Sequence, residues 1–283
     1  MAVQFIIDSS SDILPQECEK LGIAQVLPLK VIFGSEEYTD GVTMSHEDFY
    51  KKLVSSDIHP STSQVPPADF EDAYEKVTAN GDTAVVITLS SKLSGTYQSA
   101  MIAAEDYEGK VFVVGSENAA LGERCLMMRG LQLREAGLSA AEIAAKLDEE
   151  KKDIVLLASV DTLTYLQKGG RVSKAAAVAG GLLGIKPVLQ MDGEGHLIKV
   201  ATARGRKKAI EALADKYGEL SYEEKNTPIF ISHADCQEDA QKLVDMLKQR
   251  HGGEVTLLTE IGPVIGSHAG PDVLALFFLG KHR

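Results

Sequence analysis

The chain has 283 residues, which is enough for one large domain or two modest ones with a substantial core. Hydrophobic residues make up 44% and charged residues 25%, proportions that are typical of a globular protein and exclude a disordered one. The formal net charge of −12 disfavours binding to nucleic acid through its phosphates.

The cysteines and the first residues indicate the compartment. Cys18, Cys125 and Cys236 are far apart and show no Cys-x-x-Cys spacing, which favours a reducing environment. The start of the chain has no basic segment and only a short apolar run, unlike a signal peptide. The stretch without polar side chains at 175–185 is about half as long as a membrane span. We therefore expect a cytoplasmic protein.

The first half of the chain alternates between predicted strands and helices. Strands are expected at 3–7, 26–33, 83–89, 111–114 and 154–159, and helices at 14–21, 45–54, 68–78, 97–104, 119–135 and 139–151. This alternation is typical of a mostly parallel sheet with helices on both faces. The Ser/Asp segment at 8–12 follows the first strand, where ligand groups often lie. We predict an N-terminal α/β domain at 1–160.

The second half has a different pattern. A short helix at 163–168 precedes a hairpin (186–191 and 197–202), helices at 206–217 and 237–249, strands at 228–232, 254–258 and 273–279, and a turn-rich loop at 261–270. This order predicts a smaller α+β domain with a mixed or antiparallel sheet at 161–283. The apolar runs at 175–184 and 273–279 are either plain core or walls of a tunnel.

A stiff polar segment lies at 59–67. Pro60, Pro66 and Pro67 favour extended backbone around residues 61–64, whose side chains all donate hydrogen bonds. Such a cluster of donors suits an anionic or carbonyl ligand. The alternative is a connector whose hydroxyls only cap helix ends.

Ser94 occupies a second polar loop, between a buried strand and the start of a helix. Backbone N–H groups and the positive end of a helix dipole favour a carboxylate or phosphate there. An ordinary helix cap is the alternative.

Basic residues concentrate between 163 and 210. They are Lys168, Arg171, Lys174, Lys186, Lys199, Arg204, Arg206, Lys207 and Lys208, against Asp192 and Glu194. On an acidic chain this segment indicates one anionic ligand or one acidic partner, unless it is simply a solvated surface.

Several common chemistries have no signature here. The chain lacks both nucleotide-binding glycine fingerprints, the His-Glu-x-x-His motif, zinc-ligand spacing and the Gly-x-Ser-x-Gly elbow. His268 could serve Ser94 or Thr62 as a base, oriented by Asp272, which leaves a serine hydrolase or acyltransferase as an alternative function. A lone histidine is more often structural.

Four segments together resemble the four motifs of the DegV family. They are Pro60-Ser61-Thr62-Ser63-Gln64, Leu93-Ser94-Gly95-Thr96-Tyr97, Lys168-Gly169-Gly170-Arg171 and Gly266-Ser267-His268-Ala269-Gly270-Pro271. Residues 8–12 and 38–41 also match, and the resemblance spans nearly the whole chain in the right order.

The resemblance implies a bacterial two-domain protein that holds one long-chain fatty acid between its domains. Thr62 and Ser94 would hold the carboxylate, with Ser63, Gly95, Arg171 and His268 around the head group. No cofactor, metal or catalytic residue is implied, because such a protein is a carrier and not an enzyme.

The implied partner is a separate ATP-binding fatty acid kinase, which makes the acyl phosphate used as a phospholipid precursor. Arg171 and Arg204 would face this kinase, with Arg206 as a second candidate for the role of Arg204. Transient membrane contact is compatible with this function. A third possible function is that of an anion-binding regulatory module without lipid. Such a protein would contain no apolar cargo.

Overall fold

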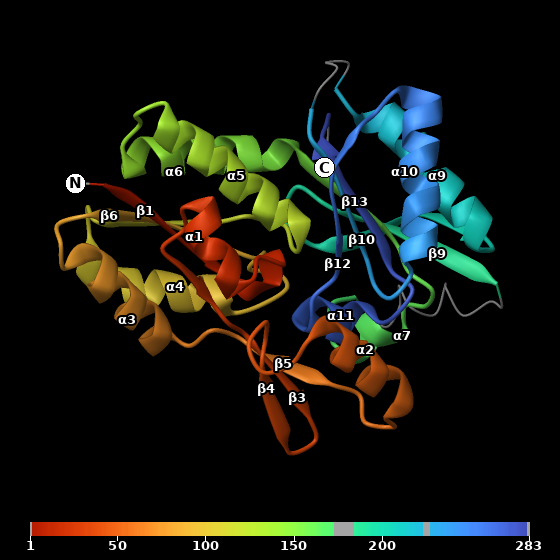
Figure 1. Cartoon of the computed structure of the whole chain (residues 1–283), viewed down its shortest axis with the longest axis horizontal. Helices are drawn as coiled ribbons and strands as arrows, with labels where there is room; N and C mark the ends of the chain where they lie inside the picture. The colour runs from red at the N-terminus through yellow and green to blue at the C-terminus, as the bar shows by residue number, and fades with distance from the viewer. Residues whose placement is uncertain (1, 173–183, 223–226, 282–283) are drawn as a thin grey trace.

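The computed structural model describes residues 2–172, 184–222 and 227–281, which form two lobes that meet along a broad junction (Figure 1). One lobe contains a parallel sheet and the other a mixed sheet. The predicted α/β architecture is therefore confirmed. Of the small-residue run at 175–184, only Gly184 lies among the described residues.

The first lobe is built on a four-stranded parallel sheet in the order β2-β1-β6-β7. The strands are β1 (Val3–Asp8), β2 (Gln25–Leu27), β6 (Thr83–Thr88) and β7 (Val111–Gly115). Phe5 and Ile6, neighbours on β1, pack into different hydrophobic clusters. Both faces of the sheet are thus buried, which explains the continuous apolar runs of its strands.

Helices cover both faces of this sheet (Figure 1). They are α3 (Pro67–Thr78) and α4 (Thr96–Ala104) on one face, and α5 (Leu121–Glu135) and α6 (Ala140–Glu150) on the other. Ser139 and Glu142 form the predicted capping box of α6. The segment predicted as one helix at 14–21 is a 3-10 turn (Pro15–Glu17) followed by the short α1 (Cys18–Leu21).

A small antiparallel sheet, β4-β3-β5, was not predicted. It contains β3 (Lys30–Phe33), β4 (Glu36–Thr39) and β5 (Ser61–Ser63), and α2 (His46–Ser55) lies beside it (Figure 1). The predicted strand at 26–33 is therefore two strands in different sheets, separated at Pro28. The predicted loop at 59–67 contains β5, because the extended backbone favoured by its prolines pairs with β3.

The second lobe is built on a six-stranded sheet in the order β10-β9-β8-β13-β11-β12, in which only β11 and β12 are parallel. Its strands are β8 (Ile154–Ser159), β9 (Ile185–Met191), β10 (Leu197–Arg204), β11 (Ile229–His233), β12 (Val255–Glu260) and β13 (Leu274–Leu279). The predicted hairpin is β9 and β10. The last strand, β13, lies in the middle of the sheet.

Two long helices, α9 (Arg206–Leu220) and α10 (Gln237–His251), cover the outer face of this sheet (Figure 1). The inner face is turned toward the first lobe, with α7 (Thr164–Lys168) and α11 (Pro263–Ala269) at its edge. The turn-rich loop predicted at 261–270 is wrong, because most of it is α11. Pro263 occupies the first turn of this helix, where a proline is well tolerated.

Side-chain hydrogen bonds hold the two lobes together. The Tyr50 hydroxyl donates to the Ile261 carbonyl at 2.9 Å, and Ser90 Oγ donates to the Gly195 carbonyl at 2.7 Å. Because β8 pairs with β9 and β13, the chain enters the second sheet at Ile154. The domain boundary at 160 stays a prediction.

Candidate functional site

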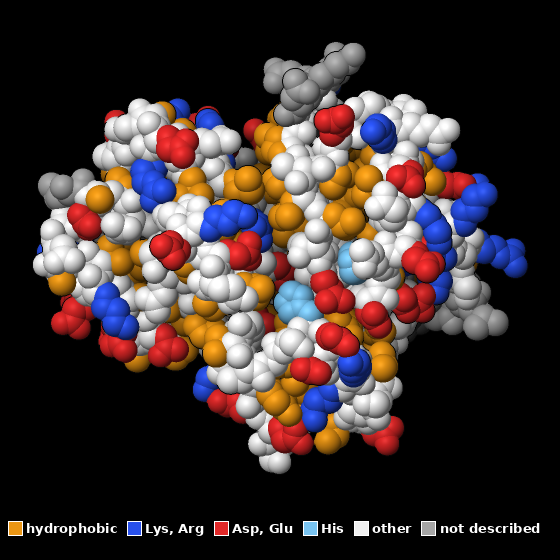
Figure 2. Space-filling model, in the orientation of Figure 1, with side chains coloured by type: hydrophobic (Ala, Val, Ile, Leu, Met, Phe, Trp, Pro, Cys, Tyr) orange, Lys and Arg blue, Asp and Glu red, His pale blue; other side chains and the backbone are white. Residues whose placement is uncertain are grey.

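An apolar cavity lies between the lobes, against the inner face of the six-stranded sheet. It contains about 830 Å³ of empty space, including its opening. Its walls are mostly aliphatic and come from both lobes, including Leu29, Leu89, Leu156, Leu189, Met191 and Val264. Figure 2 shows that apolar side chains also reach the surface along the junction of the lobes.

Four polar side chains meet at one end of this cavity, which we call the head-group end: Thr62, Ser94, Arg171 and His268. They come from β5, the loop before α4, the turn after α7 and the C-terminal turn of α11. The structure therefore brings together one residue from each of the four motifs.

Thr62 and His268 form a direct contact across the junction. Thr62 Oγ1 lies 2.7 Å from His268 Nε2. Burial, followed by the charges of Arg171 and His59, lowers the pKa of His268 to about 3, so the imidazole is neutral. In the tautomer protonated at Nε2, His268 donates to Thr62 and leaves the threonine O–H free to donate to a ligand.

Arg171 fixes the loop that holds Ser94. Its Nε donates to the Leu93 carbonyl at 2.9 Å, and its Nη1 donates to the Gly169 carbonyl. Burial lowers the pKa of Arg171, but a guanidinium keeps its charge in proteins. The head-group end thus combines hydroxyl donors with one cation, which suits a carboxylate.

Glycines allow the four motifs to approach each other closely. A Cβ at Gly95 would lie 2.0 Å from Gln64 Oε1, and a Cβ at Gly169 would lie 2.2 Å from His268 Nδ1. These contacts join the first motif to the second and the third to the fourth. The backbone φ angle of neither glycine is positive, so it is space that requires glycine at both positions.

The arrangement of a serine hydrolase is not assembled. Ser94 Oγ bonds to Thr96 Oγ1 at 2.9 Å and accepts from the Thr96 N–H, while His268 Nε2 bonds to Thr62. His268 Nδ1 has no hydrogen-bond partner among the described residues, so Asp272 does not orient the ring. Ser94 accepts from the Thr96 N–H at the start of α4, but the N-cap residue of this helix is Gly95. No basic side chain among the described residues forms a hydrogen bond with Ser94.

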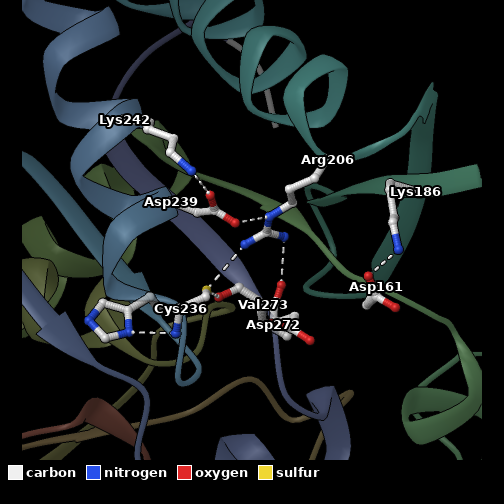
Figure 3. A network of polar contacts seen from close by, with 9 residues as sticks. Asp161, Lys186, Arg206, Cys236, Asp239, Lys242, Asp272 and Val273 are labelled. Carbon is white, nitrogen blue, oxygen red and sulfur yellow. Dashed lines mark hydrogen bonds and ion pairs between the residues drawn. The ribbon is translucent and has the colours of Figure 1, made fainter. Parts of the chain in front are cut away.

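None of the four remaining predicted residues lines the cavity. Ser63 and Gly95 flank Thr62 and Ser94 but do not line the cavity. Arg204 is exposed at the end of β10. Arg206 donates to Asp239 at 2.7 Å and to the Asp272 carbonyl at 2.7 Å, in a network that joins α9, α10 and the segment just before β13 (Figure 3). Of the two arginines, Arg204 therefore has the more accessible side chain.

Sequence reasoning missed four buried carboxylates behind the cavity wall, the carboxylate cluster of Asp8, Asp12, Asp40 and Glu123. Burial raises the pKa of Asp8 to about 6, of Asp40 to about 7 and of Asp12 to about 8, and it raises that of Glu123 well above its usual value. The Ser/Asp segment at 8–12, directly after the first strand, was a sequence signal for the two aspartates of this cluster that it contains. Nothing in the helical context of Glu123 marks it as buried.

The carboxylate cluster holds the backbone of the cavity wall. Asp8 accepts from the Leu89 N–H at 2.9 Å, and Asp12 accepts from the Gly262 N–H, just before α11, at 2.9 Å. Ser9 Oγ donates to Asp40 and accepts from the Leu29 N–H. Leu29 and Leu89 line the cavity, so these hydrogen bonds position its wall.

In residues 2–172, 184–222 and 227–281, no three His, Cys, Asp or Glu side chains are grouped so as to hold a metal ion. The helices of these same segments are all too short or too polar to cross a bilayer.

A family model described as an uncharacterised protein of the DegV family matches residues 2–281. A DegV domain-containing protein of Clostridium perfringens is 36% identical over 289 residues, covering 99% of both chains.

Solved structures agree with this match. A DegV family protein from Thermus thermophilus, described by its fatty acid binding, superimposes with a TM-score of 0.89 at 31% identity, covering 99% of this chain and 100% of the other. A DegV family protein from Eubacterium eligens, loaded with heptadecanoic acid, gives a TM-score of 0.86 at 25% identity, with coverage of 99% and 100%.

Proposed function

The chain belongs to the DegV family, and we propose that it binds one long-chain fatty acid in the cavity between its lobes. One observation supports this most strongly. Thr62, Ser94, Arg171 and His268 gather at one end of a cavity whose other walls are almost entirely aliphatic. An amphipathic ligand with one anionic end matches this distribution.

The two ends of the ligand have different roles. Burying each methylene contributes about 0.8 kcal/mol, so a tail of about sixteen carbons contributes on the order of 10 kcal/mol before the cost of association. One charge-assisted hydrogen bond contributes about 1.5 to 3 kcal/mol. The tail therefore dominates affinity, and the hydroxyls of Thr62 and Ser94 determine which end lies at the opening.

We further propose that the protein is a cytoplasmic carrier that presents this carboxylate to a separate kinase, which forms the acyl phosphate. Arg171 lies at the head-group end, where it would neutralise negative charge near the carboxylate. Arg204 is exposed and would contact the kinase. No step of the phosphoryl transfer requires a catalytic residue of this chain.

The cargo is tested by native mass spectrometry of the purified full-length protein. We expect one added mass equal to a long-chain fatty acid, and its loss on extraction with organic solvent. A protein that carries no fatty acid and takes none up after extraction would contradict the proposal. Ester turnover abolished by Ser94→Ala would favour a hydrolase instead.

The kinase role is tested by acyl-phosphate formation with the kinase and the loaded carrier. Arg204→Ala should slow the reaction without changing lipid retention, because the side chain lies outside the cavity. Lys207→Ala removes an equal charge from a nearby exposed position and serves as the control. Equal rates for wild type and Arg204→Ala would remove Arg204 from the interface.

A further inference from the structure

A second cavity lies on the same face of the six-stranded sheet, beyond the first. It contains about 1440 Å³ of empty space, including its opening, and is bordered by Cys125 and Met128 of α5 and by Ile154, Phe230 and Leu279 of the sheet. Its lining also includes charged side chains, among them those of Arg129, Glu150 and Asp153. The first cavity also lies between this sheet face and residues next to α5, namely Ala119 and Ala120. The two cavities are therefore successive spaces along one junction.

Strand register shows what separates them. Across β8, β13 and β11, Ala158 pairs with Ala275, which pairs with Ser232. These small residues form a layer in the wall of the first cavity. Their small side chains leave the space open next to the head-group end.

The next layer on the same face is much larger. Leu156 pairs with Phe277, which pairs with Phe230. Phe277 lines the first cavity and Phe230 lines the second. Both aromatic rings belong to the inner hydrophobic cluster, and only 1% of Phe277 and 2% of Phe230 is exposed.

We propose that Phe277 and Phe230 close the far end of the fatty acid site and set the longest acyl chain that the protein accepts. This inference rests on the proposed function, which places the carboxylate at the opposite end. The terminal methyl of the longest accepted chain lies against Phe277. We call the layer of Phe277 and Phe230 the aromatic layer. Beyond it, the Leu279–Ile154 layer faces the second cavity. A longer tail enters this second cavity once the aromatic side chains are truncated.

The expected increase in accepted chain length follows from strand geometry. Successive layers on one face of a sheet are two residues apart, or about 7 Å. An extended chain advances by about 1.2 Å per bond, so one layer corresponds to about six bonds. Truncating the aromatic layer should thus extend the accepted chain by up to about six carbons. Buried rings pack at crystal-like density and do not yield to a longer tail unless they are changed.

The test measures chain-length preference. The full-length protein is extracted, incubated with an equimolar series of saturated fatty acids from myristic to behenic acid, and analysed by native mass spectrometry. We expect wild type to show an upper limit of chain length, Phe277→Ala to raise it by up to about six carbons, and Phe277→Leu and Phe230→Leu to raise it less. The leucine variants provide the measurement if the alanine variant fails to fold.

Phe70→Leu is the matched control, because Phe70 is fully buried in the first lobe and lines neither cavity. An unchanged limit in every Phe277 and Phe230 variant would overturn the role of the aromatic layer while leaving fatty acid binding intact. An equal shift in Phe70→Leu would also overturn it, since general loosening would then explain the result. Wild type that binds no member of the series would contradict the proposed function itself.

Discussion

The head-group end and the carboxylate cluster are both polar regions in the interior. The first has an excess of hydrogen-bond donors, and the second has an excess of acceptors. At the head-group end, two hydroxyls and the guanidinium of Arg171 supply donors around an open space. In the carboxylate cluster, acceptors outnumber donors: serine hydroxyls and backbone N–H groups such as those of Ser10 and Leu89 bond to some of the oxygens. Asp12 Oδ2 and Glu123 Oε1 have no hydrogen-bond partner among the described residues.

This difference separates a binding region from a structural one. A surplus of donors beside a cavity is satisfied by a ligand that brings acceptors, as a fatty acid does. A group of carboxylates presents acceptors rather than donors and therefore offers nothing to an anion. We therefore expect changes at the head-group end to alter binding, and changes in the carboxylate cluster to alter stability and its dependence on pH.

The largest effect on binding is expected from Thr62→Ala combined with Ser94→Ala. Each lost hydrogen bond to the carboxylate removes about 1.5 to 3 kcal/mol, so affinity for a fatty acid should fall about a hundredfold or more. Affinity for the alcohol of the same chain length should fall much less, because it has no charge to stabilise. Titration of extracted protein with both ligands measures the difference.

Ser61→Ala is the control for this pair, since Ser61 lies on the same short strand but is exposed. Equal losses for the acid and the alcohol would show that the carboxylate is held elsewhere.

The carboxylate cluster should make the protein less stable as pH rises. The folded pKa of Asp12 is about 8, above the ordinary value of 3.8, so between these limits the folded state holds a proton that the unfolded chain has released. The free energy of unfolding should therefore fall from about pH 4 to about pH 8, and the raised pKa values of Asp8 and Asp40 act in the same direction.

Asp12→Asn should flatten this dependence and raise stability at pH 9 by up to a few kcal/mol. Asparagine tolerates the left-handed backbone at this position, where φ is 57°, and keeps an acceptor for the Gly262 N–H. Chemical denaturation at pH 5, 7 and 9 measures the effect, with the exposed Asp106→Asn as control. If Asp12→Asn retains the pH slope of wild type, the proton is not held at Asp12.

A smaller effect is expected at Gly169. An alanine there places its Cβ 2.2 Å from His268 Nδ1 and displaces the imidazole from Thr62, which should weaken fatty acid binding about tenfold. Gly170→Ala meets open space, but φ is 77°, so it should reduce stability by about 1 kcal/mol and leave binding unchanged. Binding and thermal unfolding of both variants separate a steric effect at the site from backbone strain.

The sequence was most informative where local pattern determines structure. The strands of the parallel sheet are buried on both faces, so β1 and β6 read as continuous apolar runs. Short elements such as β5 and α11 were missed because they are stabilised by neighbours distant in sequence rather than by their own periodicity.

Part of the site was predictable from the sequence motifs. The motifs identified Thr62, Ser94, Arg171 and His268, which the structure brings together. Motif membership alone could not show that Ser63 and Gly95 stand beside the cavity rather than in its wall. Burial of Glu123 and the opposition of Phe230 to Phe277 depend on which surfaces pack together, which one sequence does not state.

The close contacts of Gly95 with Gln64 and of Gly169 with His268 make the four motifs two interlocked pairs. A larger side chain at either position of a pair requires a smaller or displaced side chain at the other. Among homologous sequences, a substitution at one position should therefore be accompanied by a substitution at its partner. Transplanting a single motif between relatives should fail where exchanging both members of a pair succeeds.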